Sequence, residues 1–187
     1  NNGGNIELNS GSVLQNNWMV YSSAIEGGAG IFMDGGTAVM NGGEIKNNYG
    51  NTNTSSGGGG IFITGGDFTI NSGVISGNYC TKRGGGVSIT SSQSPVIFTM
   101  NGGSITNNAC ATFGGGLTVY ENSSNGATIE LNAGEISNNY ALANGGGVYL
   151  FLGNAQSTGY IGNGVGDEDF IISKNTVAYS GTSASGA

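Results

Sequence analysis

The stretch NGGSITNNACATFGGGLTV, residues 101–119, decides the fold because variants of it recur along the chain. Its ITNNA segment has four counterparts, which are LQNNW (14–18), IKNNY (45–49), ISGNY (75–79) and ISNNY (136–140). The fourth residue of each segment is asparagine, and successive asparagines are 31, 30, 30 and 31 residues apart. A glycine cluster and an apolar alternation follow each segment, as in GGGLTV (114–119). Self-similarity at a fixed period of this size indicates a repeat architecture.

Each repeat contains three strand-like pieces whose apolar residues recur at alternate positions, the period of a half-buried strand. We therefore predict an all-β parallel β-solenoid with about five to six coils of about 30 residues, three short strands per coil, and coils stacked about 4.8 Å apart. The residues expected to face inward form three walls: Ile61, Ile63, Val87, Ile89, Leu117, Val119, Val148 and Leu150; Phe68, Ile70, Phe98, Met100, Ile129 and Leu131; Leu14, Ile45, Ile75, Ile105 and Ile136.

The recurring asparagines are expected to form a structural ladder, in which each side-chain amide binds the next one and the backbone of the corner. The ladder residues are Asn17, Asn48, Asn78, Asn108 and Asn139. The glycine clusters permit positive φ and a close approach of the backbone at a corner. A phosphate-binding loop is the alternative interpretation, but the pattern GxxxxGK[ST] is absent and no cluster precedes an expected helix.

The full repeat, GGGV-x-I … FTMNGG-x-I-x-x-N, resembles the pectate-lyase-like right-handed parallel β-helix repeats of large bacterial and archaeal surface proteins. It is also similar to the repeats of polymorphic outer membrane proteins, whose GGAI and FxxN motifs have the counterparts GAGI (28–31), GGGI (58–61), GGGV (84–87) and IKNN (45–48). The resemblance implies a right-handed single-stranded helix, the hand that parallel crossovers favour generally. It also implies an extracellular or cell-surface location and an adhesin role.

Residues 1–187 are expected to form a single β-helix domain, a fragment of a longer repeat protein whose adjoining coils or domains would be partners. The chain has 4 Lys+Arg against 11 Asp+Glu, a net charge of −7, which argues against a nucleic-acid partner. No run of about 20 apolar residues is present, so direct membrane insertion is not expected.

Catalysis by paired carboxylates is not expected. Histidine is absent, and the acids of the outward columns are several coils apart, at least about 14 Å at the coil spacing, whereas glycosidase carboxylates lie about 5–10 Å apart. The two columns are Glu7, Val39, Thr69, Thr99 and Glu130, and Glu44, Val74, Ser104 and Glu135. No catalytic residue, cofactor or metal site is predicted.

Two sets of residues are candidates for ligand contact. The residue after the ladder asparagine forms an aromatic column, namely Trp18, Tyr49, Tyr79 and Tyr140, interrupted by Ala109. Its rings could stack on sugars or could shield a corner. The second set is the acidic run Asp167, Glu168 and Asp169 in the longest insertion, a contact for a ligand or calcium, or a solvated loop. Lys82 and Arg83, adjacent on a corner loop, could contact an anionic sugar or be solvated.

Cys80 and Cys110 are one 30-residue repeat apart and should lie side by side on adjacent coils. The expected Cα separation of about 5 Å lies within the range that a disulfide accepts. A disulfide is therefore feasible in an oxidising compartment, and an extracellular origin would favour it. The alternative is two stacked reduced cysteines.

From these observations we expect a non-enzymatic structural or adhesive module of a secreted or cell-surface microbial protein. Its loops would be displayed for host, matrix or glycan binding, because insertions in solenoids often decorate one face. The alternative is a fragment of a polysaccharide lyase or glycoside hydrolase β-helix.

Overall fold

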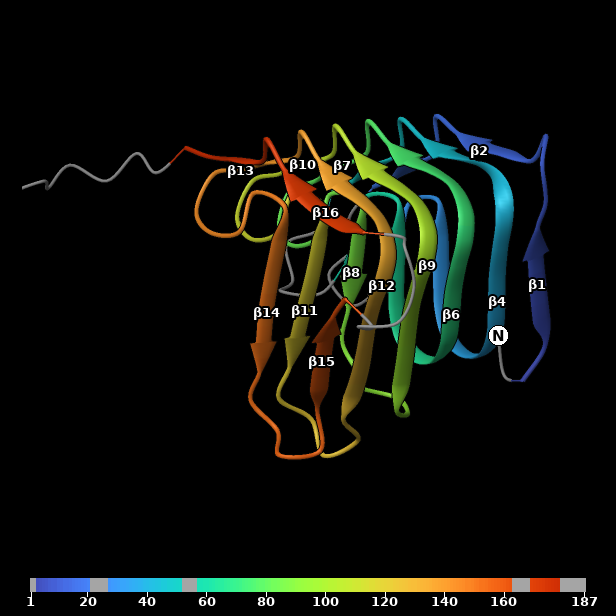
Figure 1. Cartoon of the computed structure of the whole chain (residues 1–187), viewed down its shortest axis with the longest axis vertical. Coiled ribbons are helices and arrows are strands. Elements are labelled where there is room, and N and C mark those ends of the chain that lie inside the picture. Colours follow the sequence, from blue (N-terminus) through green and yellow to red (C-terminus); the bar gives the residue numbers. More distant parts are fainter. Residues whose placement is uncertain (1–2, 21–26, 52–56, 163–168, 179–187) are drawn as a thin grey trace, which may run out of the picture.

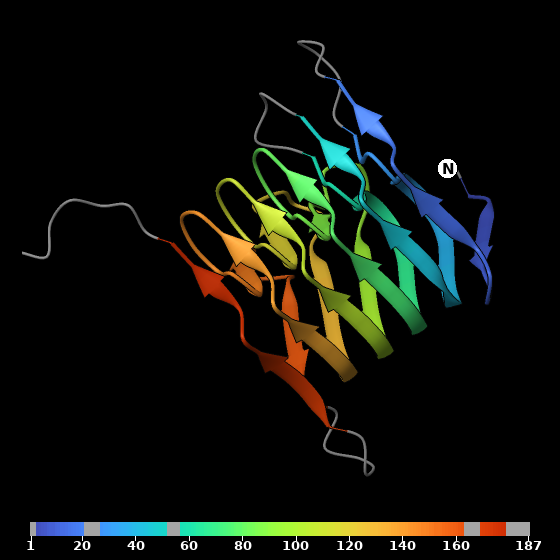
Figure 2. The same ribbon diagram turned by 90° about the horizontal axis from the view of Figure 1, so that it is seen from above.

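The computed structural model describes residues 3–20, 27–51, 57–162 and 169–178, and the described residues form β-strands without any helix (Figure 1). They accordingly contain no helix with the length and apolarity of a membrane span. Every strand pairing is parallel, and paired residues are about one 31-residue coil apart. The chain is thus a parallel β-solenoid of about five turns, as predicted, and Figure 2 shows successive coils side by side.

The strands form two sheets. The larger sheet contains β1 (Asn5–Leu8), β2 (Val13–Gln15), β4 (Ile31–Lys46), β6 (Ile61–Ser76), β8 (Val87–Ile89), β9 (Val96–Thr106), β11 (Leu117–Glu121), β12 (Ala127–Ser137), β14 (Val148–Leu152), β15 (Thr158–Ile161) and β16 (Phe170–Ser173). The smaller sheet contains β3 (Trp18–Met19), β5 (Tyr49–Gly50), β7 (Tyr79–Cys80), β10 (Ala109–Cys110), β13 (Tyr140–Ala141) and β17 (Thr176–Val177).

The three predicted pieces of a coil belong to the larger sheet, and in β4 and β6 they run on as one bent strand of 16 residues. The smaller sheet adds a fourth, two-residue strand to each coil, directly after the ladder asparagine. Two residues are too few to show an alternation of apolar and polar side chains, which is why the sequence pattern did not reveal this strand.

The core fills the inside of the solenoid, and the predicted inward residues of its central coils are buried. Equivalent residues stack along the axis, for example Phe68 on Phe98 with ring centroids 6.2 Å apart. Three of the predicted inward residues differ: Leu14 and Val148 are only partly buried, and Leu150 is 36% exposed, so its prediction as a core residue is wrong. They belong to the first and last described coils, where a neighbouring coil covers them on one side only.

The ladder asparagines are fully engaged, as predicted. Asn108 is 1% exposed, and its Nδ2 donates to the carbonyl of Ile75 at 2.9 Å and to Oδ1 of Asn139 at 3.1 Å. Its Oδ1 accepts from the backbone N–H of Asn78 at 3.0 Å and from the Asn78 amide at 2.9 Å. The same bonds continue to a sixth member, Asn175, which the sequence analysis did not include. We call this row the inner ladder.

The corner before each ladder asparagine requires a left-handed backbone, with φ between 53° and 63°. Asparagine and glycine tolerate this conformation best, and they occupy all but one of these positions. The corner residues are Asn16, Asn47, Gly77, Asn107, Asn138 and Lys174.

The glycine triplets make room for the ladder. A Cβ added to Gly116 would lie 2.6 Å from the carbonyl oxygen of Gly147 and 2.8 Å from Nδ2 of Asn139. Because backbone oxygens of the next coil cannot move aside, only glycine lets adjacent coils approach this closely. The triplets are therefore structural.

The corner loops fold back onto the outer side of the first wall. The backbone N–H of Gly84 donates to Oγ1 of Thr118 at 3.0 Å, and that hydroxyl donates to the carbonyl of Phe113 at 2.7 Å. As a result, Phe62 and Ser88, which alternate with inward residues, are also fully buried. This covering brings loop side chains onto the strands of the next coil.

A second row of asparagines lies on the outside of the solenoid, between the second and third walls. It comprises Asn41, Asn71, Asn101 and Asn132, joined by side-chain amide bonds of 2.8, 3.1 and 2.9 Å. Asn41 also donates to the carboxylate of Glu7 at 2.9 Å. These side chains are exposed or half-exposed, and within the described residues they bond to other side chains rather than to the backbone. We call this row the outer ladder.

Candidate functional site

The predicted aromatic column lies along the smaller sheet, and its first three rings touch. Trp18 and Tyr49 meet edge to face with centroids 5.0 Å apart, and Tyr49 stacks on Tyr79 at 5.2 Å. Trp18 is 70% exposed, whereas Tyr79 is half-buried. Burial, followed by the neighbouring Tyr49, raises the pKa of Tyr79 above 10.0, so its hydroxyl is neutral at physiological pH. Because Trp18, Tyr49 and Tyr79 touch one another, their ring edges face the solvent. A ligand could stack only on the ring faces at the two ends of this group.

Tyr140 lies apart from this stack. Its β13 strand pairs with β10, so that Ala109 is the direct neighbour of Tyr140 on one side and of Tyr79 on the other. Tyr140 is 37% exposed. The structure therefore brings three of the four predicted rings together and leaves a one-coil gap before the fourth.

A second aromatic group, not predicted from the sequence, covers the outer side of β11 and β14. We call it the aromatic cluster and define it as Phe113, Tyr120, Tyr149 and Phe151. Tyr120 stacks on Phe151 with centroids 4.8 Å apart and planes 17° apart, and Phe113 stacks on Tyr149 at 5.0 Å. Phe151 is 40% exposed, so the cluster reaches the surface.

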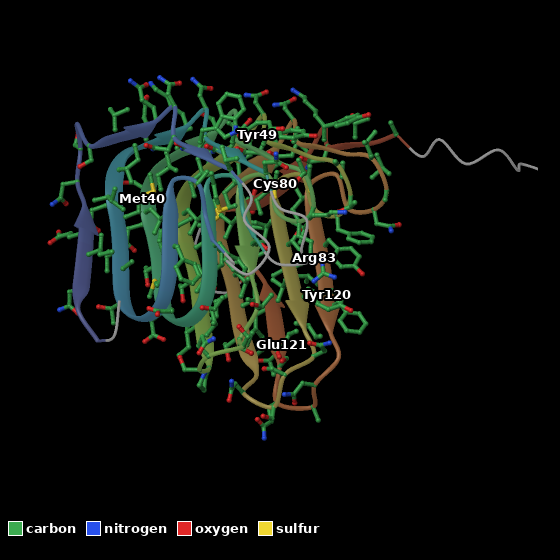
Figure 3. All side chains as sticks on the ribbon, turned by 180° about the vertical axis from the view of Figure 1, so that it is seen from behind. Met40, Tyr49, Cys80, Arg83, Tyr120 and Glu121 are labelled. Carbon is green, nitrogen blue, oxygen red and sulfur yellow. The ribbon has the colours of Figure 1, made fainter. Side chains whose placement is uncertain are left out.

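Arg83 extends the aromatic cluster by one member. Its Cζ lies 3.6 Å from the centroid of the Tyr120 ring, a cation–π contact, and Figure 3 shows the two side chains next to each other. Among the described residues, no carboxylate lies within ion-pair distance of Arg83 or of its neighbour Lys82. The guanidinium is thus oriented by a ring rather than neutralised by an acid, and its N–H edge is available to an anion.

A buried carboxylate, Glu121, follows Tyr120 at the end of the same strand. Glu121 is fully buried and accepts from the backbone N–H of Ser91 at 2.7 Å, from the Ser91 hydroxyl and from the N–H of Ser123. Burial raises the pKa of Glu121, but the hydrogen bonds from Ser123 and Ser91 outweigh burial and bring it below its ordinary value of 4.5. The ionised side chain ties the loop after β11 to the preceding coil.

Cys80 and Cys110 are direct partners on β7 and β10, as their spacing predicted, and both are buried free thiols. The hydrogen bond with Cys110 and burial raise the pKa of the Cys80 thiol. The register confirms that the two cysteines are neighbours on adjacent coils, and the disulfide itself stays a prediction.

The acidic run of the longest insertion lies mostly outside the described residues. Asp167 and Glu168 are not among them, and Asp169 is exposed. Within the described ranges, no group of three or more Asp, Glu or Cys side chains is placed to hold a metal ion.

Two open hollows of about 350 Å³ each contain one glutamate. Ser10, Gly11, Ser12, Val13, Gly43, Glu44 and Val74 line the first, and Glu130, Asn132, Tyr160 and Gly162 line the second. The strand register confirms the two predicted outward columns, which place Glu7 four coils from Glu130 and Glu44 three coils from Glu135. Neither hollow pairs two carboxylates across a space that a glycosidic bond would occupy.

No family model matches the chain, and no curated protein or solved structure shows significant similarity to it. The fold and the geometry of the described surfaces are therefore the basis for a functional conclusion.

Proposed function

We propose that the chain is a non-enzymatic adhesive module of a secreted or cell-surface microbial protein, and that its ligand is an acidic glycan. The rigid solenoid holds outward rings and loop side chains in fixed positions. Acidic glycans offer both a carboxylate or sulfate group and apolar C–H faces, which are the two features that the aromatic cluster and Arg83 are suited to contact.

The observation that carries the proposal is the guanidinium of Arg83, which lies over Tyr120 beside the exposed ring of Phe151 and has no acidic partner in the described part of the chain. Lys82, Arg83 and Lys174 all lack an acidic partner among the described residues, and of these three Arg83 is the one with a cation–π contact. Stacking on Tyr120 orients the planar guanidinium, so less conformational freedom is lost when it forms a bidentate bond to an anion.

The alternative function, a fragment of a polysaccharide lyase or glycoside hydrolase, has less support. Each of the two hollows contains a single glutamate, and Arg83 stands without a carboxylate partner among the described residues. A display role needs only a ligand-contacting surface, which the aromatic cluster provides.

The experiment is calorimetric titration of the protein with two acidic probes, hexagalacturonate and a chondroitin sulfate hexasaccharide. We expect binding of at least one probe and at least a tenfold loss of affinity in Arg83→Gln. Lys174→Gln is the matched control, because it also removes one positive charge but lies on another corner, and its affinity should stay within twofold of the parent.

Absence of binding for both probes, or equal losses in the two variants, would overturn the proposal. Equal losses would mean that overall charge, rather than the arrangement of Arg83 over Tyr120, governs the interaction.

A further inference from the structure

Ala109 interrupts a row of large side chains. Along β3, β5, β7, β10 and β13, the equivalent positions hold Trp18, Tyr49, Tyr79, Ala109 and Tyr140. The alanine methyl group is the only side chain between Tyr79 and Tyr140 in this row. Ala109 and Tyr79 are half-buried, and Tyr140 is 37% exposed, so the interruption opens toward solvent.

The interruption has the dimensions of one ring. Adjacent coils are about 4.8 Å apart, so the backbones at Tyr79 and Tyr140, two coils apart, are separated by about 9.6 Å. A ring placed midway would lie about 4.8 Å from each tyrosine, which matches the 5.2 Å between the stacked rings of Tyr49 and Tyr79 in the same column.

The corner residues that precede β10 and β13 are polar and uncharged. Asn107 and Asn138 precede the two strands by one ladder residue each, and both are exposed. Asn107 makes no hydrogen bond through its side chain within the described part of the chain, so its amide can donate to and accept from a ligand. An interruption between two tyrosines, with exposed asparagines on the adjoining corners, suits a ring that has apolar faces and hydroxyls around its circumference.

We propose that the slot over Ala109, between Tyr79 and Tyr140, binds a single hexopyranose ring. The axial C–H groups of the sugar face the two tyrosine rings, and its equatorial hydroxyls reach the asparagine amides. This site is distinct from the aromatic cluster and rests on the proposed function in one respect, namely that the ligand is a carbohydrate. An aromatic side chain of a partner would fit the spacing but would leave the amides unused.

The test uses Ala109→Tyr, which places the protein's own ring in the slot, and Ala109→Ser, which keeps the slot open. The probes are the uncharged oligosaccharides cellohexaose and maltohexaose, titrated by calorimetry. We expect the parent to bind at least one probe, Ala109→Ser to bind within twofold of the parent, and Ala109→Tyr to bind at least tenfold more weakly. Tyr140→Ala, which removes one face of the slot, should also bind at least tenfold more weakly.

Thermal unfolding provides a second readout that does not depend on the sugar. If the slot is ring-sized, Ala109→Tyr completes the stack and should unfold at or above the temperature of the parent. A clear decrease, or failure of this variant to fold, would show that no such space exists and would overturn the proposal. So would binding of neither probe by the parent, or undiminished binding by Ala109→Tyr.

The results also separate this proposal from the proposed function. Arg83→Gln should leave binding of the uncharged probes within twofold, because the slot does not use its charge. If the acidic probes bind through Arg83 while Ala109→Tyr changes nothing, the slot proposal alone fails. If only the uncharged probes bind, and do so through the slot, the assignment of acidic glycans to Arg83 fails instead. Tighter binding of p-cresol than of either sugar would assign the slot to an aromatic group and overturn the hexopyranose.

Discussion

The inner and outer ladders are rows of the same residue at the same spacing on the same solenoid, yet they differ in their partners. Each central inner asparagine, such as Asn108, bonds two side-chain amides and two backbone groups and is 1% exposed. An outer asparagine such as Asn101 bonds only side chains and is exposed. A periodic residue thus becomes structurally important when it satisfies buried backbone groups, since these cannot turn to water instead.

The largest expected effect comes from substituting one asparagine in each ladder. Asn108→Ala should lower the free energy of unfolding by about 3–5 kcal/mol, because it leaves the buried N–H of Asn78 without its partner, at about 1–3 kcal/mol, and removes the bond to the carbonyl of Ile75 and two amide–amide bonds. Asn101→Ala should change it by no more than about 0.5 kcal/mol, because water replaces the lost bonds. Urea unfolding followed by circular dichroism measures both.

If Asn108→Ala and Asn101→Ala lowered the free energy of unfolding by similar amounts, the proposed difference between the inner and outer ladders would be wrong. Such a result would show that a regular row of amides stabilises the solenoid regardless of burial and backbone partners.

A buried carboxylate extends the comparison from amides to a charged group. Glu121→Gln should lower the free energy of unfolding by about 1–2 kcal/mol at pH 7, because it replaces charge-assisted bonds from Ser91 and Ser123 with weaker neutral ones. Because the pKa of Glu121 is depressed by folding, its stabilisation is present above pH 4.5 and is lost as pH falls through the lower folded value. The difference between the two proteins should therefore narrow below pH 4.5 in urea unfolding.

The control is Glu130→Gln, whose carboxylate accepts one hydrogen bond, from Thr99, and is not buried. It should change the free energy of unfolding by at most about 0.5 kcal/mol at pH 7. A Glu121→Gln difference that stays constant down to pH 3 would contradict an ionised role for Glu121.

The smallest effect concerns the corner at the last member of the inner ladder. Lys174 has φ 53°, where other coils have asparagine or glycine. Lys174→Asn should raise the free energy of unfolding by about 0.5–1 kcal/mol, because asparagine adopts this left-handed conformation at lower cost. Lys174→Gln should give no increase, and an equal gain in both variants would point to loss of the charge instead. Thermal and urea unfolding of the three proteins provide the comparison.

The inner ladder could be predicted from the repeat length of the sequence, and the core from the alternation of apolar and polar residues along each strand. A 30-residue step aligns Asn78 with Asn108, and an alternation of two places Leu117 and Val119 on one side. Asn175 was missed because the insertion before it lengthens the last step to 36 residues, although ISKNT (172–176) keeps the corner pattern.

The aromatic cluster could not be predicted in this way. The contact between Arg83 and Tyr120 joins residues 37 apart, and it exists because a corner loop folds back over the next coil. Neither the repeat length nor the alternation of apolar residues specifies how a corner loop folds back onto the neighbouring coil. Only the pairing of Tyr120 with Phe151, in equivalent positions 31 residues apart, left a readable signal.

The two ladders also have a direction, and the directions are opposite. Along the inner ladder each Nδ2 donates to the amide of the C-terminal coil, from Asn17 to Asn48 and onward, and its second hydrogen goes to a backbone carbonyl of the preceding coil, as from Asn78 to Ile45. Along the outer ladder the amides donate toward the N-terminal coil, a sense set by the carboxylate of Glu7, which can only accept from Asn41. Aligned amide dipoles add, as they do in a helix, so a single row would build up a macroscopic dipole with every coil. Because the two rows point in opposite directions, their dipoles largely cancel, and the ladders add little net dipole along the axis of the solenoid.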